Sequence, residues 1–452
     1  MGKAFGYWVT VLALTVAAVV AAASVAYFTG DLNKLICSGQ CSEEFISSPL
    51  EESGFVQEPA VVLGEITGPL DPQKISQIVT AGLDSTKLGN DVAITIRDYQ
   101  TGDVLLQEDD KPQVPASSIK ILTATAALET FGTEFRFETK LVKESDGTYI
   151  LVGGGDPLLT KKSLNALAEQ ASEQMKEQTI SLGYDNSLFI GPTLHPDWTD
   201  SYFASGASAH ILPLRVHPPF RKPDSQDPTS DAMNMFAQAL EERGVTVNLV
   251  GERKAASTAV QIAEKQSPRM ATIVERVVRF SDNYATEVLG RHLALAKNQP
   301  ASFAGAVAAT TEVASELQID DSSLKLYDVS GLSPRNNVRP ATIVELLSES
   351  AKDEDRWVVY QGLPVSGVIG TLDRRFGIAQ TKPGRGFVRA KTGTLNGVTS
   401  LSGLVVTADG GAAYFSVMAD GVPSGQGWNA EIVLDKIFAN IAACACRLGT
   451  TP

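Results

Sequence analysis

The sequence has 452 residues and a formal net charge of −14, with 38 Lys and Arg residues against 52 Asp and Glu residues. A chain of this length can bury a large core, and we expect two domains after its N-terminal segment. The acidic balance argues against a nucleic-acid partner. Only four histidines occur, and none stands at a metal-ligand spacing from another His or Cys, so no zinc or Ser-His-Asp enzyme is expected, and no metal or cofactor is predicted.

An uncharged run from Ala4 to Phe28 follows the single cation Lys3. A run of about 25 uncharged residues can span a bilayer, so residues 1–30 are predicted to be a membrane anchor whose N-terminal end stays inside while the body is exported. The alternative is a cleaved signal segment with a processing site at Ala21-Ala22-Ala23. Both alternatives place the body outside the cytoplasm, on the outer face of the membrane or secreted to the cell wall or periplasm.

The four cysteines support export. Cys37 and Cys41 follow the membrane segment, whereas Cys444 and Cys446 lie near the C-terminus. Two cysteines that are two residues apart in a regular element point away from each other, so we predict disulfides from the N-terminal pair to the C-terminal pair, which would tie the chain ends together. The alternative is a bond within the N-terminal pair with the other two cysteines free, and the sequence alone leaves all three connectivities open.

Helical and alternating patterns follow an acidic, polar linker over residues 31–68. The body begins at Asp71-Pro72, an N-cap followed by proline at the first helical position. The further elements that periodicity predicts are strands over 91–98, 104–106, 135–142 and 149–152, a helix over 163–176, a strand over 187–190, helices over 231–243, 271–280 and 285–296, strands over 386–391, 398–406 and 412–418, and a helix over 429–443.

The middle of the chain differs from the rest in its pattern of predicted elements, which are short strands and the glycine-rich turn Gly153-Gly154-Gly155-Asp156-Pro157. We expect residues 133–266 to form an inserted domain. It would interrupt a main domain built from residues 69–132 and 267–447.

A serine and a lysine stand three residues apart at the start of a small, apolar helical run, in Pro115-Ala116-Ser117-Ser118-Ile119-Lys120. Ser117 belongs in the first turn, where free amides and the helix dipole favour a developing negative charge, and Lys120 lies on the same face. Desolvation pushes a lysine toward its neutral form, which can take a proton from serine. We therefore predict a serine nucleophile with a lysine base. The pattern by itself is common, since Ser322-Ser323-Leu324-Lys325 is a second copy.

A second motif, Ser281-Asp282-Asn283, follows a predicted helix. A short turn here can aim a hydroxyl and an amide into a cleft. The Ser281 hydroxyl would relay a proton to a leaving amine, and the Asn283 side chain would hold a substrate amide. Ser163-Leu164-Asn165 has the same Ser-x-Asn pattern, so the motif by itself is weak.

The third motif is Lys391-Thr392-Gly393-Thr394, in the first of three strands that are expected to form an antiparallel meander. The Lys391 ammonium suits a substrate carboxylate, and Gly393 lets a ligand lie close along the strand. The N–H groups of Thr394 and Ser117 would form a two-donor oxyanion hole. The alternative is an ordinary lysine on an edge strand.

Taken in order, the three motifs resemble the signature of penicillin-binding proteins and serine β-lactamases. The chain further resembles the D-alanyl-D-alanine carboxypeptidase/endopeptidase family of low-molecular-mass class C penicillin-binding proteins (peptidase family S13), over most of residues 70–440. The stretches that carry the resemblance are 115–120, 153–157, Ser281-Asp282-Asn283, Asp328-Val329-Ser330-Gly331-Leu332-Ser333, 363–372 and 391–403.

The resemblance implies an α/β (α+β) fold, with a transpeptidase/β-lactamase-like domain whose antiparallel sheet is flanked by helices, plus an inserted smaller domain. It implies that Ser117 is acylated and that Lys120 is the base. Ser281 and Asn283 would be the proton relay and the substrate clamp.

For the substrate, the resemblance implies that Lys391 and Thr394 bind the terminal carboxylate. It also implies that an Asp of the inserted domain and an Arg after the Gly-Leu-Ser stretch bind the diamino acid side chain of the peptide. Trp198-Thr199-Asp200 is similar to the first of these, which makes Asp200 a candidate. The Arg stands one residue late, so Arg335 is a candidate that departs from the family pattern.

The predicted function is that of an exported serine-type D-Ala-D-Ala carboxypeptidase/endopeptidase that acts on peptidoglycan stem peptides through an acyl-enzyme on Ser117 and is inhibited by β-lactams, with the balance between the two activities left open. The implied partners are those peptides, β-lactam antibiotics and the membrane. A β-lactamase is one alternative, although no Glu-x-x-Leu-Asn stretch lies between Ser281 and Lys391. A membrane-tethered β-lactam-sensing or wall-binding protein with little turnover is the other.

Overall fold

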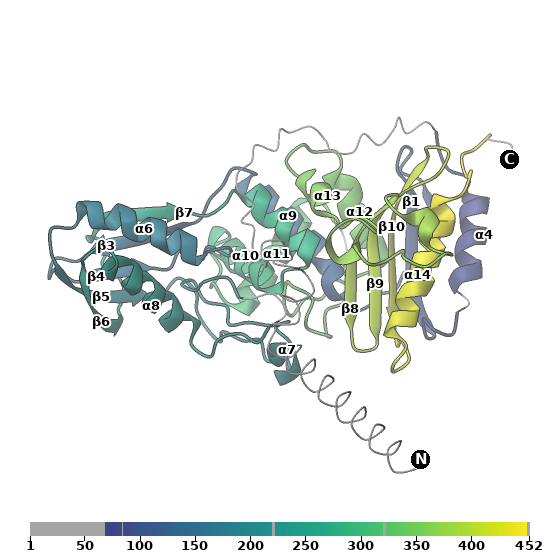
Figure 1. The fold of residues 1–452 in the computed structure, drawn as a ribbon. Helices are drawn as coiled ribbons and strands as arrows, with labels where there is room; N and C mark the ends of the chain where they lie inside the picture. Colours follow the sequence, from purple (N-terminus) through teal and green to yellow (C-terminus); the bar gives the residue numbers. More distant parts are fainter. Residues whose placement is uncertain (1–67, 84, 219–221, 320–321, 450–452) are drawn as a thin grey trace, which may run out of the picture. The chain divides into compact units, whose positions relative to one another are not determined.

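A computed structural model of the chain describes residues 68–83, 85–218, 222–319 and 322–449 (Figure 1). The predicted anchor, the predicted linker up to residue 67, and Cys37 and Cys41 lie outside these residues. Among the helices that the described residues form, none combines the length and the apolar character that a membrane span needs.

An antiparallel sheet of five strands, in the order β2-β1-β10-β9-β8, is built from the two ends of the described chain (Figure 1). Nearly every residue of β9 and β10 is buried, because helices cover both faces of the sheet. The strands are β1 (Asp91–Asp98), β2 (Val104–Glu108), β8 (Val388–Leu395), β9 (Val398–Val406) and β10 (Ala412–Asp420).

One face of this sheet packs against α4 (Pro72–Leu83) and α14 (Gly427–Ala442). Ile75 of α4 and Phe438 of α14 share a core with Phe415 of β10, and the two phenylalanine rings stack with their centroids 3.7 Å apart.

The opposite face of the sheet packs against α5 (Lys120–Phe131), α9 (Met270–Phe280) and α12 (Pro340–Ser350). Tyr414 and Met418 of β10 belong to this second core. The result is three layers, helices–sheet–helices, which agrees with the predicted antiparallel sheet flanked by helices.

A second sheet of five strands, in the order β6-β5-β4-β3-β7, is mixed, with β5 parallel to both of its neighbours. Helices α6 (Lys161–Gln174) and α8 (Pro228–Glu241) share a core with it through Leu167 and Phe236. The strands fall within the range predicted as an inserted domain, although that division of the chain stays a prediction. They are β3 (Glu138–Lys143), β4 (Tyr149–Val152), β5 (Thr179–Asp185), β6 (Thr246–Glu252) and β7 (Val260–Gln266).

Local capping signals decide where several helices begin. Asp227 accepts a hydrogen bond from the N–H of Ser230, with Pro228 at the first helical position of α8. Ser302 caps α11 in the same way, by accepting from the N–H of Gly305. The remaining helical segments are η1 (Ala116–Ile119), α7 (Asp200–Ala204), α10 (Asn283–Ala296), α11 (Phe303–Glu316), α13 (Val358–Gly362), η2 (Gly370–Leu372) and η3 (Lys382–Gly384).

The predicted strand over 187–190 is wrong. The Asp185 carboxylate accepts a hydrogen bond from the N–H of Ser187 at 2.8 Å, and this local turn ends the preceding strand. The strand that forms instead is β5, in which Ile180 and Leu182 alternate toward the core. Strand β6 escaped prediction. Its apolar residues Val247, Leu249 and Val250 form only a short run before Gly251, and nearly all of its residues are exposed in the structure.

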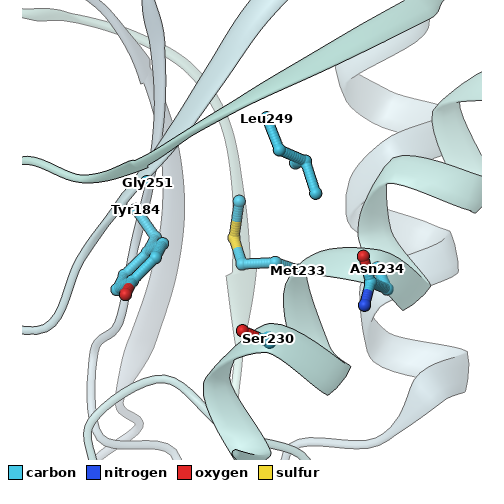
Figure 2. A pocket seen from close by; sticks show the side chains of 6 residues that line it. All are labelled: Tyr184, Ser230, Met233, Asn234, Leu249 and Gly251. Atoms are coloured by element: carbon cyan, nitrogen blue, oxygen red, sulfur yellow. The ribbon is translucent and has the colours of Figure 1, made fainter.

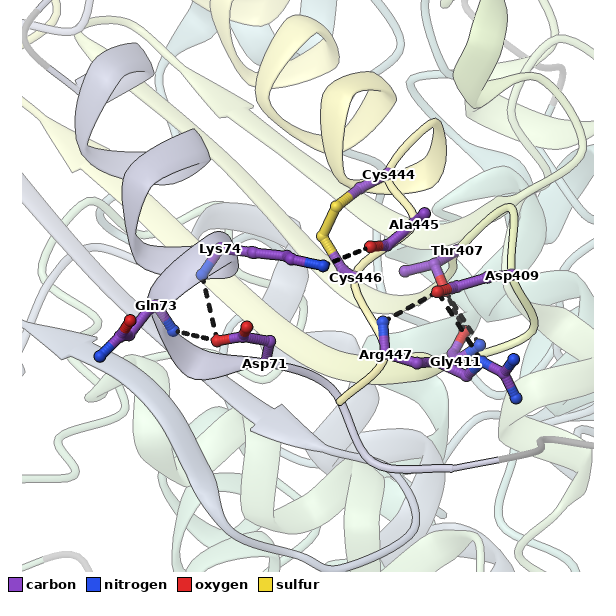
Figure 3. The surroundings of a disulfide bond; sticks show 10 residues. All are labelled: Asp71, Gln73, Lys74, Thr407, Asp409, Gly411, Cys444, Ala445, Cys446 and Arg447. Atoms are coloured by element: carbon purple, nitrogen blue, oxygen red, sulfur yellow. Dashed lines mark hydrogen bonds and ion pairs between the residues drawn. A yellow bond between two sulfur atoms is a disulfide. The ribbon is translucent and has the colours of Figure 1, made fainter. Parts of the chain in front are cut away.

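The predicted cysteine pairing is also wrong for the C-terminal pair, because Cys444 and Cys446 are bonded to each other (Figure 3). The rule for regular elements does not apply, since both residues lie beyond the end of α14 in an irregular segment. Their Cα atoms are 5.1 Å apart, within the normal range for a disulfide.

Hydrogen bonds, and not a disulfide, join the start of the described body to its end. The Asp71 N–H donates to the Cys446 carbonyl at 2.7 Å, and Lys74 Nζ donates to the Ala445 carbonyl at 2.9 Å (Figure 3). The disulfide therefore shapes the short segment against which the first turn of α4 is anchored.

Candidate active site

Ser117 lies in η1, a 3-10 turn that leads directly into α5. The residue before it, Ala116, has a φ of 45°, a left-handed conformation that costs a non-glycine residue roughly 1–2 kcal/mol. Gly331 packs against this residue, since a Cβ added to Gly331 would lie 2.0 Å from the Ala116 carbonyl oxygen. The turn that presents Ser117 is therefore strained and closely packed.

Lys120, the first residue of α5, is fully buried. Its Nζ donates to Ser117 Oγ at 3.0 Å, to Asn283 Oδ1 at 2.6 Å and to the Ser330 carbonyl oxygen at 2.5 Å. These three acceptors match the three donors of a lysine ammonium. The amine thus joins the first motif to the second and to the Asp328–Ser333 stretch.

Burial makes this lysine easier to deprotonate. Desolvation lowers the pKa of Lys120 to about 8, although the negative charges of Asp328, Glu287 and Asp282 oppose the shift. A neutral amine is therefore accessible near neutral pH, within hydrogen-bonding distance of the Ser117 hydroxyl.

The Asn283 side chain is held at both ends. Its Oδ1 accepts from Lys120 as described, and its Nδ2 donates to the Ala207 carbonyl at 2.7 Å. Ser281, two residues earlier, ends α9 in the left-handed conformation, with φ 58° and ψ 45°. Chain connectivity therefore places Ser281 beside the Lys120 site.

Asp282 fixes this turn from within. Its carboxylate caps α10 by accepting from the N–H of Ala285 at 3.0 Å, and its Oδ2 bonds to His217 Nε2 at 2.7 Å and Arg276 Nε at 3.0 Å. Burial by itself would raise the pKa of the Asp282 carboxyl, but His217 and Arg276 overcome this and hold the pKa well below its usual range. The turn is therefore anchored by a partly buried cluster of Asp282, Arg276 and His217.

The third motif lies on β8, the edge strand of the first sheet. Lys391 is fully buried and its Nζ donates to the Thr392 carbonyl at 2.8 Å. Desolvation, and then the nearby charge of Lys120, lower the pKa of Lys391 well below its usual value. A Cβ added to Gly393 would lie 2.7 Å from the Pro115 carbonyl oxygen, so β8 touches the turn that carries Ser117.

The two threonines of the third motif are engaged elsewhere. Thr392 Oγ1 lies 2.7 Å from Thr371 Oγ1, and Thr394 Oγ1 donates to Glu431 Oε1 of α14 at 3.1 Å. In a strand, alternate side chains point to opposite faces, so these hydroxyls lie on the face opposite to Lys391. The backbone N–H of Thr394 is left as the group that the predicted oxyanion hole would use.

A buried row of serine hydroxyls, which sequence reasoning missed, fastens the nucleophile turn to the sheet. Ser118 Oγ lies 2.9 Å from Ser400 Oγ of β9, and Ser400 Oγ donates to the Pro115 carbonyl at 2.8 Å. Ser402 continues the row to Ser416 at 2.9 Å. The available signal was the pair of alternate serines within an otherwise apolar strand.

The two candidates for side-chain recognition do not pair with each other. Arg335 Nε instead bonds to Asp197 Oδ2 at 2.8 Å, and its guanidinium lies 3.9 Å from the centre of the Tyr327 ring. Asp200 is exposed in the first turn of α7. The predicted roles of Asp200 and Arg335 in binding the diamino acid side chain stay predictions. The acid that the structure places beside Arg335 is Asp197.

A cavity of 160 Å³ lies between α8 and strands β5 and β6, away from the three motifs (Figure 2). Within the described ranges, no cluster of three His, Cys, Asp or Glu side chains could hold a metal ion. The residues that line the cavity are Tyr184, Ser230, Met233, Asn234, Leu249 and Gly251.

The model of the D-Ala-D-Ala carboxypeptidase 3 (S13) family matches residues 75–218 and 211–441. The chain belongs to this family. It is 32% identical over 393 residues to a carboxypeptidase of Mycobacterium tuberculosis, covering 82% of this chain and 83% of that protein. It is 29% identical over 465 residues to carboxypeptidase DacB of Mycolicibacterium smegmatis, covering 97% and 96%.

The fold of this S13 chain is shared with a solved structure. Penicillin-binding protein 4 from Haemophilus influenzae superposes with a TM-score of 0.71 at 21% identity, covering 81% of this chain and 98% of that chain. The predicted family, fold class and enzyme class are thus confirmed. The side chains that the structure brings together in this S13 chain are Ser117, Lys120, Asn283 and Lys391, with Ser281 on the adjoining turn.

Proposed function

We propose that Ser117 is the nucleophile of a serine-type D-Ala-D-Ala carboxypeptidase/endopeptidase that acts on the stem peptides of peptidoglycan. The observation that carries the proposal is the Lys120 amine, 3.0 Å from Ser117 Oγ and 2.6 Å from Asn283 Oδ1. One buried amine thus serves the nucleophile and the substrate-holding side chain together.

The neutral amine of Lys120 would take the Ser117 proton as Oγ attacks the carbonyl carbon of the penultimate D-Ala. The peptide bond breaks, the terminal D-Ala leaves with a proton relayed through Ser281, and an ester remains on Ser117. Water then attacks the ester and frees the shortened peptide. The N–H groups of Ser117 and Thr394 would stabilise the oxyanion of both steps.

The two buried lysines suit an anionic substrate. Burial, and then the charge of Lys120, lower the pKa of Lys391. A substrate carboxylate beside Lys391 would stabilise the ammonium there. The charged Lys391 would in turn favour the neutral form of Lys120, so that binding of the correct substrate prepares the base.

A covalent-labelling experiment followed by a turnover assay tests the proposal. The full chain is treated with a fluorescent penicillin, the adduct is located by mass spectrometry, and hydrolysis of a diacyl-D-Ala-D-Ala peptide is measured. We expect the adduct on Ser117 together with release of D-Ala. A label without release of D-Ala would favour the β-lactam sensor, rapid loss of the label with hydrolysed penicillin would favour a β-lactamase, and no label would rule out any acyl-enzyme.

The rate of acylation should rise with pH through about 8. The reactive form is the neutral amine, and burial lowers the pKa of Lys120 to about 8, so the reactive fraction falls as the pH drops below 8 and approaches its plateau above it. Stopped-flow measurement of the second-order acylation rate from pH 6 to 10 checks this. A rate that does not change between pH 6 and 9 would contradict a lysine base.

We also propose that residues 1–30 hold the enzyme on the outer face of the membrane, with its site facing the cell wall. The uncharged run from Ala4 to Phe28 supports this. Intact-mass measurement of the protein from the membrane fraction should find the N-terminal segment still attached, whereas a mass that begins near Ala23 would show a cleaved signal segment.

A further inference from the structure

A second buried acid lies behind the Lys120 amine. Glu287 stands four residues after Asn283 on α10, one helical turn along the same face, and its side chain is fully buried. Its Oε1 accepts hydrogen bonds from the N–H of Val329 at 3.1 Å and from the N–H of Ser330 at 2.8 Å.

Ser330 connects this acid to the lysine. Its N–H donates to Glu287, and its carbonyl oxygen accepts from Lys120 Nζ at 2.5 Å. The position of one backbone residue therefore depends on Glu287 and in turn sets one of the three contacts of the amine.

The rest of the loop is held by a different acid, Asp328, which uses both of its oxygens. Its Oδ1 accepts from the Gly331 N–H at 2.9 Å, and its Oδ2 accepts from the Ser333 N–H at 2.6 Å and from Trp198 Nε1 at 2.9 Å. Glu287 differs, because within the described residues its Oε2 is buried and makes no hydrogen bond. A buried oxygen without a donor favours the uncharged acid over the carboxylate.

We propose that Glu287 is a positioning residue for the base: it holds the Ser330 carbonyl against the Lys120 amine, and by staying uncharged it leaves that amine free to become neutral. This inference rests on the proposed function, in which Lys120 takes the proton of Ser117.

The charges around the two groups are consistent with this role. Burial, followed by the nearby Asp328 carboxylate, raises the pKa of Glu287 to about 8, against the opposing effects of the Ser330 hydroxyl, the Ser330 N–H and the charge of Arg291. Lys120 itself faces Asp328, Glu287, Asp282 and the second lysine, Lys391. An ionised Glu287 would add one more negative charge beside the ammonium and would retain the proton on Lys120.

Glu287 acts electrostatically on Lys120, and burial brings the pKa of each group to about 8, so their titrations are coupled. As the pH rises, ionisation of Glu287 opposes loss of the proton from Lys120, so the pH profile of the wild-type acylation rate should be broad. Without an ionisable group at position 287, Lys120 should lose its proton at lower pH and over a narrower range.

The test compares Glu287→Gln and Glu287→Ala in the full chain by the acylation rate with fluorescent penicillin between pH 5.5 and 10. Glutamine keeps an acceptor for the two N–H groups but cannot ionise. We expect its plateau rate to stay within about threefold of wild type, with the midpoint of the profile lower by roughly half to one pH unit. Alanine frees Ser330, and we expect a plateau rate lower by about 30-fold or more.

Asp435→Asn is the matched control, because Asp435 is a buried acid of α14 that is bonded to Arg375. It should change thermal stability without moving the midpoint of the pH profile. If Glu287→Ala fails to fold, the midpoint of the pH profile of Glu287→Gln still tests the inference. A Glu287→Gln profile that superposes on the wild type would overturn the inference, and absence of label on the wild type would overturn the acyl-enzyme and this inference with it.

Discussion

Replacing Lys120 by methionine should lower the acylation rate at pH 7.5 by about a thousandfold. The loss follows from removing the only amine within hydrogen-bonding distance of Ser117 Oγ in the described structure, at 3.0 Å, because a positioned base contributes roughly 10²–10⁴ to the rate. The fold should survive. Methionine fills a similar volume, and the burial cost of the ammonium disappears along with its hydrogen bonds to Asn283 and Ser330.

The measurement is the second-order rate of labelling by a fluorescent penicillin, with thermal unfolding as the check on folding. The chain supplies its own control in the second Ser-x-x-Lys copy, since Ser322 and Lys325 are exposed. Ser322→Ala and Lys325→Met should label like wild type, whereas Ser117→Ala should not label at all. Labelling of Lys120→Met within tenfold of wild type would show that another group is the base.

Replacing Gly331 by alanine should lower the free energy of unfolding by roughly 2–5 kcal/mol and the acylation rate by about a hundredfold. Two costs add. Gly331 has a φ of 85°, which alanine adopts at a cost of about 1–2 kcal/mol, and the new Cβ would lie 2.0 Å from the Ala116 carbonyl oxygen, an overlap that costs about 1–3 kcal/mol to relieve. The movement would displace Ser117, and a shift of about 1 Å is enough for a hundredfold loss.

Gly102→Ala separates the two costs. Gly102 has a φ of 75°, and a Cβ added there would meet no atom within 4 Å, so this variant should lose only the conformational term and label at the wild-type rate. Chemical denaturation and labelling rates of both variants provide the comparison. Equal losses of stability, with normal labelling of Gly331→Ala, would mean that the Ala116 contact does not hold the nucleophile in place.

The parts of this protein that could be predicted from its sequence are those that short-range signals specify. The helix at Asp71-Pro72 and the three strands of the C-terminal meander form where capping and alternation place them. A strand such as β6 could not be predicted, because its residues are exposed and its pairing with β5 is made across about 60 intervening residues.

The candidate site likewise has residues that the sequence predicts and contacts that it does not. Residue type and spacing single out Ser117, Lys120 and Asn283, because a lysine three residues from a serine on a helix must share its face. Nothing in their neighbourhood along the chain indicates that Lys120 would contact the Ser330 carbonyl, or that Arg335 would pair with Asp197.

The sequence by itself therefore determined which residue types were available for the chemistry and which short elements would carry them, because helix turns and strand alternation depend on neighbours a few residues apart. Only the tertiary structure decided the surroundings of those residues: the disulfide within the C-terminal pair, the buried Glu287 behind Ser330, and the closeness of the two lysines. The disulfide depends on how the chain turns beyond α14, whereas Glu287 meets Ser330 across 43 residues and Lys120 lies near Lys391 across a far longer stretch of chain. Packing of these segments also removes water from the space between them, and desolvation is what lowers the pKa of Lys120 to about 8.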